Sequence, residues 1–304
     1  MVGRACRIIR FPAPSAEAGR KTCARLMRII PFTICAFCLV ALSCFFPLGP
    51  AQASGNLDLR LERLLTEDLE DLFGFVTGNV LFTLYHEGGH MLVSEFGLPI
   101  LGQEEDAVDN LATVTMLSVH DPDMDLWLSN AMIGWFLIAE RNADDLTFYG
   151  EHDLDLQRGY RILCLMAGSD EAAFGQLATD LGLPSDRRAS CANDYEQTWQ
   201  SWEKATKAHL RSSEKPAGRI SIYYRKVPPD LASMEIFLKE SGLLELVAEN
   251  FDTLYALPDK VTFTARPCGQ ENAYWDPDKR ELTLCYELMA GFAELYLDQV
   301  ATNN

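Results

Sequence analysis

Two histidines four residues apart, inside an apolar helical segment, constrain the fold of this chain more than any other feature of its sequence. Apolar side chains recur at helical spacing over residues 77–95, and Gly97 and Pro99 end the pattern. His86 and His90 stand at positions i and i+4 of this segment, so their rings project from one face of the helix. The fold must therefore contain an apolar helix that presents two imidazoles side by side.

The segment reads His86-Glu87-Gly88-Gly89-His90, and these residue types suit a zinc site. Both imidazoles can reach one ion at about 2.0–2.1 Å. Glu87 can act as a general base, because zinc lowers the pKa of a bound water toward about 7 and a nearby carboxylate can take its proton. The alternative is a buried histidine pair with a structural role, but the helical, apolar context favours the metal site. Two glycines weaken a helix, which indicates that something passes close to the backbone there.

A catalytic zinc site needs a third protein ligand, and an acidic segment downstream can supply it. A second helix is predicted over residues 104–119, and Glu105 and Asp109 share one of its faces. We predict that Glu105 is the third ligand and that Asp109 holds a ligating imidazole through its free N–H. Glu104 and Asp106 are predicted to point elsewhere on the helix. The alternatives are Asp106 or Asp109 as the ligand, or an acidic run that only favours a helix N-terminus.

A third histidine, His152, comes just before a helix predicted over residues 154–167. A hydrolytic metal site needs a donor that stabilises the oxyanion opposite the metal. We predict a catalytic role of this kind for His152, with Arg158 as the alternative donor and Asp155 orienting the imidazole. The competing interpretation is an exposed helix N-terminus capped by Asp153.

Residues 1–53 have the character of an export signal. Residues 1–28 hold seven basic residues and one acid, an apolar run follows over 29–48, and Ala-Gln-Ala at 51–53 is a small-x-small cleavage pattern. A true start at Met27 would give a signal of ordinary length. The alternatives are a retained membrane anchor and a lipoprotein at Cys44. We predict cleavage after residue 53 and an exported protein, periplasmic or secreted.

The remaining chain is strongly acidic. Without residues 1–53 it has 19 Lys and Arg against 43 Asp and Glu, a formal charge of −24. Binding to phosphate groups needs the opposite sign, so nucleic acid and, after signal removal, the membrane are not expected partners. The expected partner is a peptide or protein substrate.

Four cysteines remain beyond residue 53, namely Cys164, Cys191, Cys268 and Cys285, and no CxxC spacing occurs among them. An even number in an exported chain predicts disulfides rather than a cysteine zinc site. Sequence proximity favours Cys164–Cys191 and Cys268–Cys285, although four cysteines allow three pairings.

The periodic segments predict an α+β fold in which residues 54–304 form a single domain. Residues 54–215 are its helical part, which carries the zinc site, and residues 216–304 are its sheet-containing part. Residues 121–125 are predicted to be a solvated turn. Further helices are predicted at 57–72, 126–140, 154–167, 170–181, 188–211, 231–250 and 287–300, and strands of a small antiparallel sheet at 219–226, 260–266, 271–276 and 280–286.

The HEGGH motif and several later segments resemble a family of bacterial putative metallopeptidases whose function is assigned by motif. More broadly, the chain is similar to the gluzincin class, to which thermolysin belongs, where HExxH is followed by a Glu ligand in an ExxxD segment. The gap from His90 to Glu105 is shorter here, and the strands follow the motif helix rather than precede it. The segments that carry the resemblance are 86–90, 98–109, 151–158, 163–164, 268–269, 272–277 and 284–287.

The resemblance implies a zincin-like fold and zinc-dependent peptide-bond hydrolysis, with His86, His90 and Glu105 as metal ligands and Glu87 as the base. The competing interpretation is a non-catalytic zinc-binding, zincin-like domain for peptide binding or envelope structure. A third interpretation is an acidic exported binding protein in which the HEGGH motif occurs by chance. Glu87 favours the hydrolase, because a structural zinc site needs no base beside its first ligand.

Overall fold

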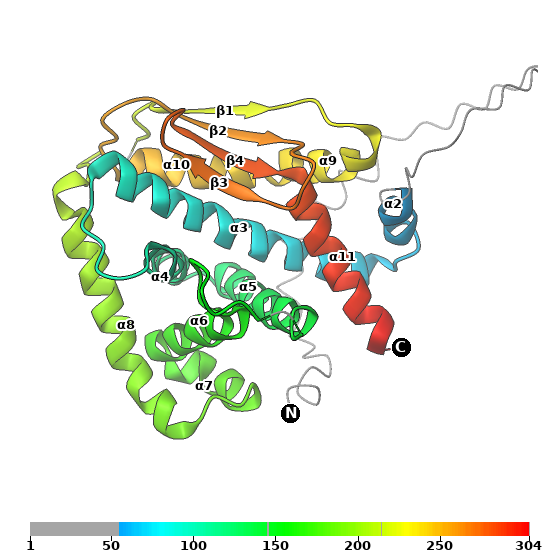
Figure 1. Cartoon of the computed structure of the whole chain (residues 1–304), viewed down its shortest axis with the longest axis horizontal. Helices are drawn as coiled ribbons and strands as arrows, with labels where there is room; N and C mark the ends of the chain where they lie inside the picture. The colour runs from blue at the N-terminus through cyan, green and yellow to red at the C-terminus, as the bar shows by residue number, and fades with distance from the viewer. Residues whose placement is uncertain (1–54, 145, 214, 304) are drawn as a thin grey trace, which may run out of the picture.

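The computed structural model describes residues 55–144, 146–213 and 215–303. The predicted export signal, with Met27 and Cys44, lies outside these residues. Figure 1 shows a small sheet on one side and a layer of helices on the other, with the long helix α3 (Thr66–Phe96) between them. A single buried apolar core includes residues from both sides of α3.

Helix α3 is the central element of the fold. Its residues from Leu72 to Leu92 are nearly all buried, as expected for a helix that is apolar around its whole circumference. It ends at Gly97, which adopts a left-handed conformation and donates its N–H to the carbonyl of Val93. The helix predicted at 57–72 is wrong in its bounds, because α2 (Gly55–Leu61) ends early and α3 already begins at Thr66.

Five helices form the layer below α3: α4 (Glu104–Leu117), α5 (Pro122–Arg141), α6 (Asp155–Ser169), α7 (Glu171–Asp180) and α8 (Ser185–Thr206). The prediction of a solvated turn at 121–125 is wrong. Asp121 accepts hydrogen bonds from the N–H groups of Asp123 and Met124, and Pro122 takes the first helical position, so this segment starts α5. A short 3₁₀ turn, η2 (Lys207–His209), ends the helical part.

Within the described residues the sheet has four strands: β1 (Ile220–Tyr224), β2 (Val261–Arg266), β3 (Ala273–Asp276) and β4 (Glu281–Cys285). Their order is β1-β2-β4-β3, with β1–β2 and β2–β4 parallel and only β3–β4 antiparallel. The prediction of an antiparallel sheet is therefore wrong, and the sheet is mixed.

The connection between β1 and β2 explains the parallel pairing. It contains the 3₁₀ turn η3 (Pro229–Leu231), α9 (Ala232–Ser241) and α10 (Leu243–Leu254), which return the chain to the starting edge of the sheet. The predicted helix at 231–250 is broken into α9 and α10 by Gly242, which has a φ of 67°. The chain closes with α11 (Tyr286–Asn303), which packs on α3.

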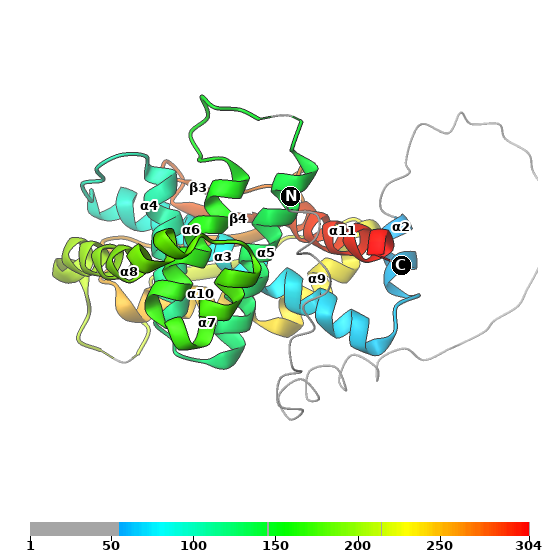
Figure 2. The same ribbon diagram turned by 90° about the horizontal axis from the view of Figure 1, so that it is seen from below.

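Figure 2 shows the loop between α5 and α6 projecting on the side of the molecule where α4 and β3 lie. The predicted disulfides are confirmed: Cys164–Cys191 joins α6 to α8, and Cys268–Cys285 joins the segment before β3 to the end of β4. Two disulfides are compatible with an oxidising compartment. Among the described residues, none of the helices could span a lipid bilayer.

We predict that replacing both Cys164 and Cys191 by Ala lowers the free energy of unfolding by about 3 kcal/mol, because the bridge closes a loop of 27 residues in the unfolded chain. Denaturant titration measures the loss. Peptide mapping of the wild-type chain should recover the two bridged pairs. Free thiols, crossed pairs or an unchanged midpoint would contradict the prediction.

Candidate metal centre

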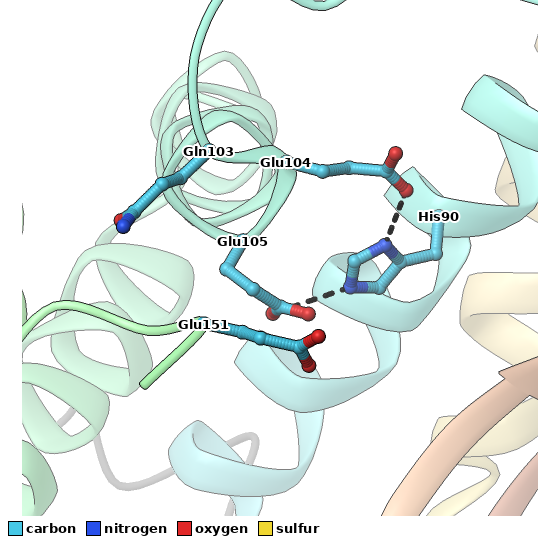
Figure 3. A pocket seen from close by; sticks show the side chains of 5 residues that line it. All are labelled: His90, Gln103, Glu104, Glu105 and Glu151. Carbon is cyan, nitrogen blue, oxygen red and sulfur yellow. Dashed lines mark hydrogen bonds and ion pairs between the residues drawn. The ribbon is translucent and has the colours of Figure 1, made fainter. Parts of the chain in front are cut away.

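Three side chains converge between α3 and α4. One ligand atom from each of His86, His90 and Glu105 lies within 4.8 Å of the other two. The Nε2 atoms of the two histidines are 3.3 Å apart, and Glu105 Oε2 lies 3.1 Å from the first and 3.3 Å from the second. The structure thus brings the three predicted metal ligands together, and Figure 3 shows two of them, His90 and Glu105.

The remaining ring nitrogens are held by carboxylates. His86 Nδ1 lies 2.7 Å from Asp109 Oδ1, and His90 Nδ1 lies 2.8 Å from Glu104 Oε1. When each Nδ1 donates its proton to a carboxylate, each Nε2 presents a lone pair to the space between the rings. In metal sites, a carboxylate that accepts the free ring N–H of a ligating histidine fixes the orientation of that ring.

This donor set fits a divalent cation. Two nitrogen lone pairs and a carboxylate oxygen repel one another at about 3 Å unless a proton or a cation lies between them. Glu105 Oε2 is buried, and imidazole nitrogens of three histidines lie 2.8–3.3 Å from it. Two nitrogens and one oxygen are also the ligand types of many catalytic zinc sites.

Glu104 is the site residue that the sequence interpretation missed. It was predicted to point elsewhere, but its carboxylate binds His90. It is the first residue of α4, and the N-terminus of that helix lies against His90. Only its position directly before Glu105 could have indicated this role. Asp106 does point away and pairs with Arg161 at 3.0 Å.

Asp109 is buried and links His86 to Arg158. Arg158 donates to both carboxylate oxygens, from Nε at 2.7 Å and from Nη2 at 2.8 Å, and its guanidinium lies 3.5 Å from the centre of the Trp135 ring. Burial would raise the pKa of Asp109, but the charge of Arg158 and the hydrogen bonds from His86 and Arg158 together outweigh it and lower that pKa to about 2. Arg158 therefore fixes Asp109, and the alternative role of oxyanion donor predicted for it is wrong.

His152 reaches the cluster from the loop between α5 and α6. Its Nε2 lies 2.8 Å from Glu105 Oε2, its side chain is 47% exposed, and its ring stacks with that of His86 at 6.3 Å between centroids. The prediction that Asp155 orients this imidazole is wrong, because Asp155 accepts a hydrogen bond from Asn142 at 2.9 Å.

Glu87 is buried beside the histidines and accepts a hydrogen bond from the backbone N–H of Trp275 in β3. Burial raises the pKa of its carboxyl, while His86 and His90 act in the opposite direction. A carboxyl with a raised pKa holds a proton more readily than an exposed one, which favours the transfer of a proton by a general base.

The two glycines of the motif allow two other helices to touch α3. A Cβ at Gly88 would lie 2.2 Å from the ring of Phe251 in α10, and a Cβ at Gly89 would lie 2.8 Å from Val108 in α4. This confirms that something passes close to the backbone there. In particular, Gly89 sets the distance between α3 and α4, and thus between the histidines and Glu105.

A pocket of about 490 Å³ opens at the cluster (Figure 3). It is lined by His90, Gln103, Glu104, Glu105 and Glu151.

A family model described as putative metallopeptidase matches residues 58–205 and 223–304. The matched residues include the histidine pair, the acidic helix, the loop that carries His152, and β2 to β4. No curated protein and no solved structure matches the chain.

We predict that Gly89→Ala destabilises the fold by about 1–3 kcal/mol through overpacking against Val108, which exceeds the roughly 1 kcal/mol that Ala gains in helix propensity. It should also weaken metal binding, because α4 carries Glu105. A Val108→Gly background removes both atoms of Val108 that the new Cβ would meet, so a double-mutant cycle should show strong coupling between the two positions. Additive effects on unfolding and on metal affinity would refute the close-packing account.

The metal-free protein should lose stability as pH rises. Burial would lower the pKa of His86, but the hydrogen bonds to Asp109 and Glu105 outweigh it and raise the pKa to about 9. A raised histidine pKa stabilises the fold fully below the unfolded value of about 6.5, and this stabilisation is lost as pH rises through 9. Melting curves of metal-free protein between pH 6.5 and 9.5 measure the decline, and Asp109→Asn should reduce it. Stability that rises over this range would contradict the prediction.

Proposed function

We propose that this chain, which belongs to the putative metallopeptidase family, is a zinc-dependent hydrolase of peptide bonds. The observation that carries the proposal is the convergence of His86, His90 and Glu105 on one point with Glu87 buried beside them. A site that only held a metal for structure would not require this additional acid, whose raised pKa suits proton transfer.

We assign His86, His90 and Glu105 as the zinc ligands. When bound, zinc would polarise the substrate carbonyl and lower the pKa of the attacking water. Three protein ligands leave coordination positions open, which is typical of catalytic rather than structural zinc. Asp109 and Glu104 fix the imidazoles in the orientation and tautomer that ligation requires.

Glu87 moves the proton in the proposed reaction. It accepts a proton from water as the water oxygen bonds to the carbonyl carbon, and it then delivers that proton to the leaving nitrogen as the C–N bond breaks. The products are a carboxylic acid and an amine, so water is the only co-reactant. His152 is proposed to stabilise the negative charge on the carbonyl oxygen, because its imidazole already reaches Glu105 from the exposed side.

A peptide is the substrate that the surroundings of the site suit best. Strand β3 is an edge strand of the sheet, lies against α3, and touches Glu87 through Trp275. The free edge of a strand offers backbone donors and acceptors to an extended peptide. A sheet edge beside a helix with the metal motif is the arrangement of a zincin-like fold, here with the sheet after the helix in the chain.

We further propose that residues 1–53 direct export and are removed, and that residues 54–304 work as one domain in the periplasm or outside the cell. The two disulfides support this compartment. The formal charge of −24 after removal of the signal argues against nucleic acid and membrane partners.

The proposal predicts that Glu87→Gln keeps zinc and the wild-type melting temperature but cleaves peptides about 10²–10⁴-fold more slowly. The amide has the same shape and can still accept the Trp275 N–H, but it cannot take a proton. His86→Ala is the matched variant that should lose zinc. Metal analysis of purified protein and a broad peptide-cleavage screen give both results.

Two outcomes would overturn the proposal. A Glu87→Gln protein that cleaves as fast as the wild type would exclude Glu87 as the base. A wild-type protein that holds one zinc per chain and cleaves nothing in the screen would support the non-catalytic zinc-binding domain instead.

A further inference from the structure

Glu151 is the pocket residue that the proposed reaction leaves without a role. Figure 3 shows its side chain pointing toward the carboxylate of Glu105 and the ring of His90. It is exposed, and it makes no hydrogen bond or ion pair with any residue that the structure describes. The other two glutamates of the pocket are engaged, Glu104 by His90 and Glu105 by the three imidazoles.

Nearby cations are committed to other carboxylates. Arg158 binds Asp109 with two hydrogen bonds, and Arg161 pairs with Asp106 and Asp153. Glu151 therefore has no counter-ion on its own loop or on α6 within the described residues.

A bound zinc ion would not compensate Glu151 either. The two charges of zinc would be balanced by Glu105 and Glu104, while Arg158 already balances Asp109. Glu151 is also absent from the group of ligand atoms that lie within 4.8 Å of one another. Its negative charge thus remains at the mouth of the metal site, where it attracts a cation from solution.

We propose that Glu151 binds a cationic group of the substrate beside the bond that is cleaved. The group is a primary ammonium or a guanidinium, supplied either by the free N-terminus of a peptide or by a Lys or Arg side chain. Because Glu151 precedes His152 in the same loop, the bound cation lies next to the group proposed to contact the carbonyl oxygen. This inference rests on the proposed peptidase function and adds a substrate class to it.

Steady-state kinetics on matched peptides test the proposal. One arm compares a peptide that the wild type cleaves with its N-acetylated form, and the other replaces a Lys beside the cleaved bond by norleucine. The enzymes are zinc-loaded wild type, Glu151→Gln, Glu151→Lys and the control Asp144→Asn, which removes an exposed carboxylate from the same loop outside the pocket.

The expected result is a preference of roughly tenfold in kcat/KM for the cationic peptide in one arm, typical of a charge-assisted contact. Glu151→Gln should abolish the preference, Glu151→Lys should reverse it in favour of a Glu-containing peptide, and Asp144→Asn should retain it. A preference in the first arm would identify the bound cation as the peptide N-terminus, and a preference in the second arm would identify it as a side chain. An unchanged preference in Glu151→Gln overturns the proposal, as does loss of zinc, which would make Glu151 a ligand.

A binding measurement separates this proposal from the peptidase function. Titration calorimetry of zinc-loaded Glu87→Gln protein with the same peptides needs no cleavage. The Glu87→Gln protein should bind the cationic peptide more tightly than the neutral one, and the double variant Glu87→Gln, Glu151→Gln should not. This result supports the role of Glu151 even if the wild type cleaves nothing. Equal affinity for charged and neutral peptides refutes it even if the protein is an active peptidase.

Discussion

The close approach of α4 to α3 is the constraint on which the metal centre depends. It exists because residue 89 has no side chain, so Val108 can pack directly against the backbone of α3. That contact brings the N-terminal half of α4 opposite the two histidines, which is where Glu104, Glu105 and Asp109 lie. The entropic cost of a glycine within a helix is offset here by a geometry that no larger residue permits. A packing requirement thus determines which carboxylates face which imidazoles.

The second constraint is charge. Glu87, Glu104, Glu105 and Asp109 surround one histidine pair, and Asp109 has a buried arginine as its partner. Without a metal, protons on the imidazoles must balance this negative charge, which is why the pKa of His86 is raised. With a metal, those protons leave Nε2 and the cation takes their place. Proton and metal therefore compete for the same space, and the cluster is stable as a unit only when one of them is present.

Local sequence patterns predicted most of this structure, and contacts between distant segments account for what they missed. The helix over 77–95, the disulfide pairs and the convergence of His86, His90 and Glu105 follow from periodicity, the number and proximity of the cysteines, and ligand spacing. Glu104 was missed because its role depends on where the start of α4 meets His90, which helix faces alone do not reveal. The role of Arg158 was missed because its contact with Asp109 spans 49 residues. The parallel strands were missed for the same reason, since hydrophobic alternation does not encode strand order.

Strand order matters for the proposed chemistry as well as for the fold. Because β4 lies between β2 and β3, the short strand β3 becomes the edge that faces α3. Trp275 of that strand donates its backbone N–H to Glu87, nearly 200 residues earlier in the chain. The Cys268–Cys285 bridge and two hydrogen bonds from the Cys268 N–H to Glu287 secure the segment that leads into β3. The sheet thus does more than cover the core: it fixes the carboxyl that must exchange a proton, while α4 fixes the ligands. Glu87 shares α3 with two of the ligands, but its carboxyl is held by β3, whereas carboxylates of α4 hold the imidazoles. A substitution that disturbs β3 therefore acts on the Glu87 carboxyl without first moving Glu105.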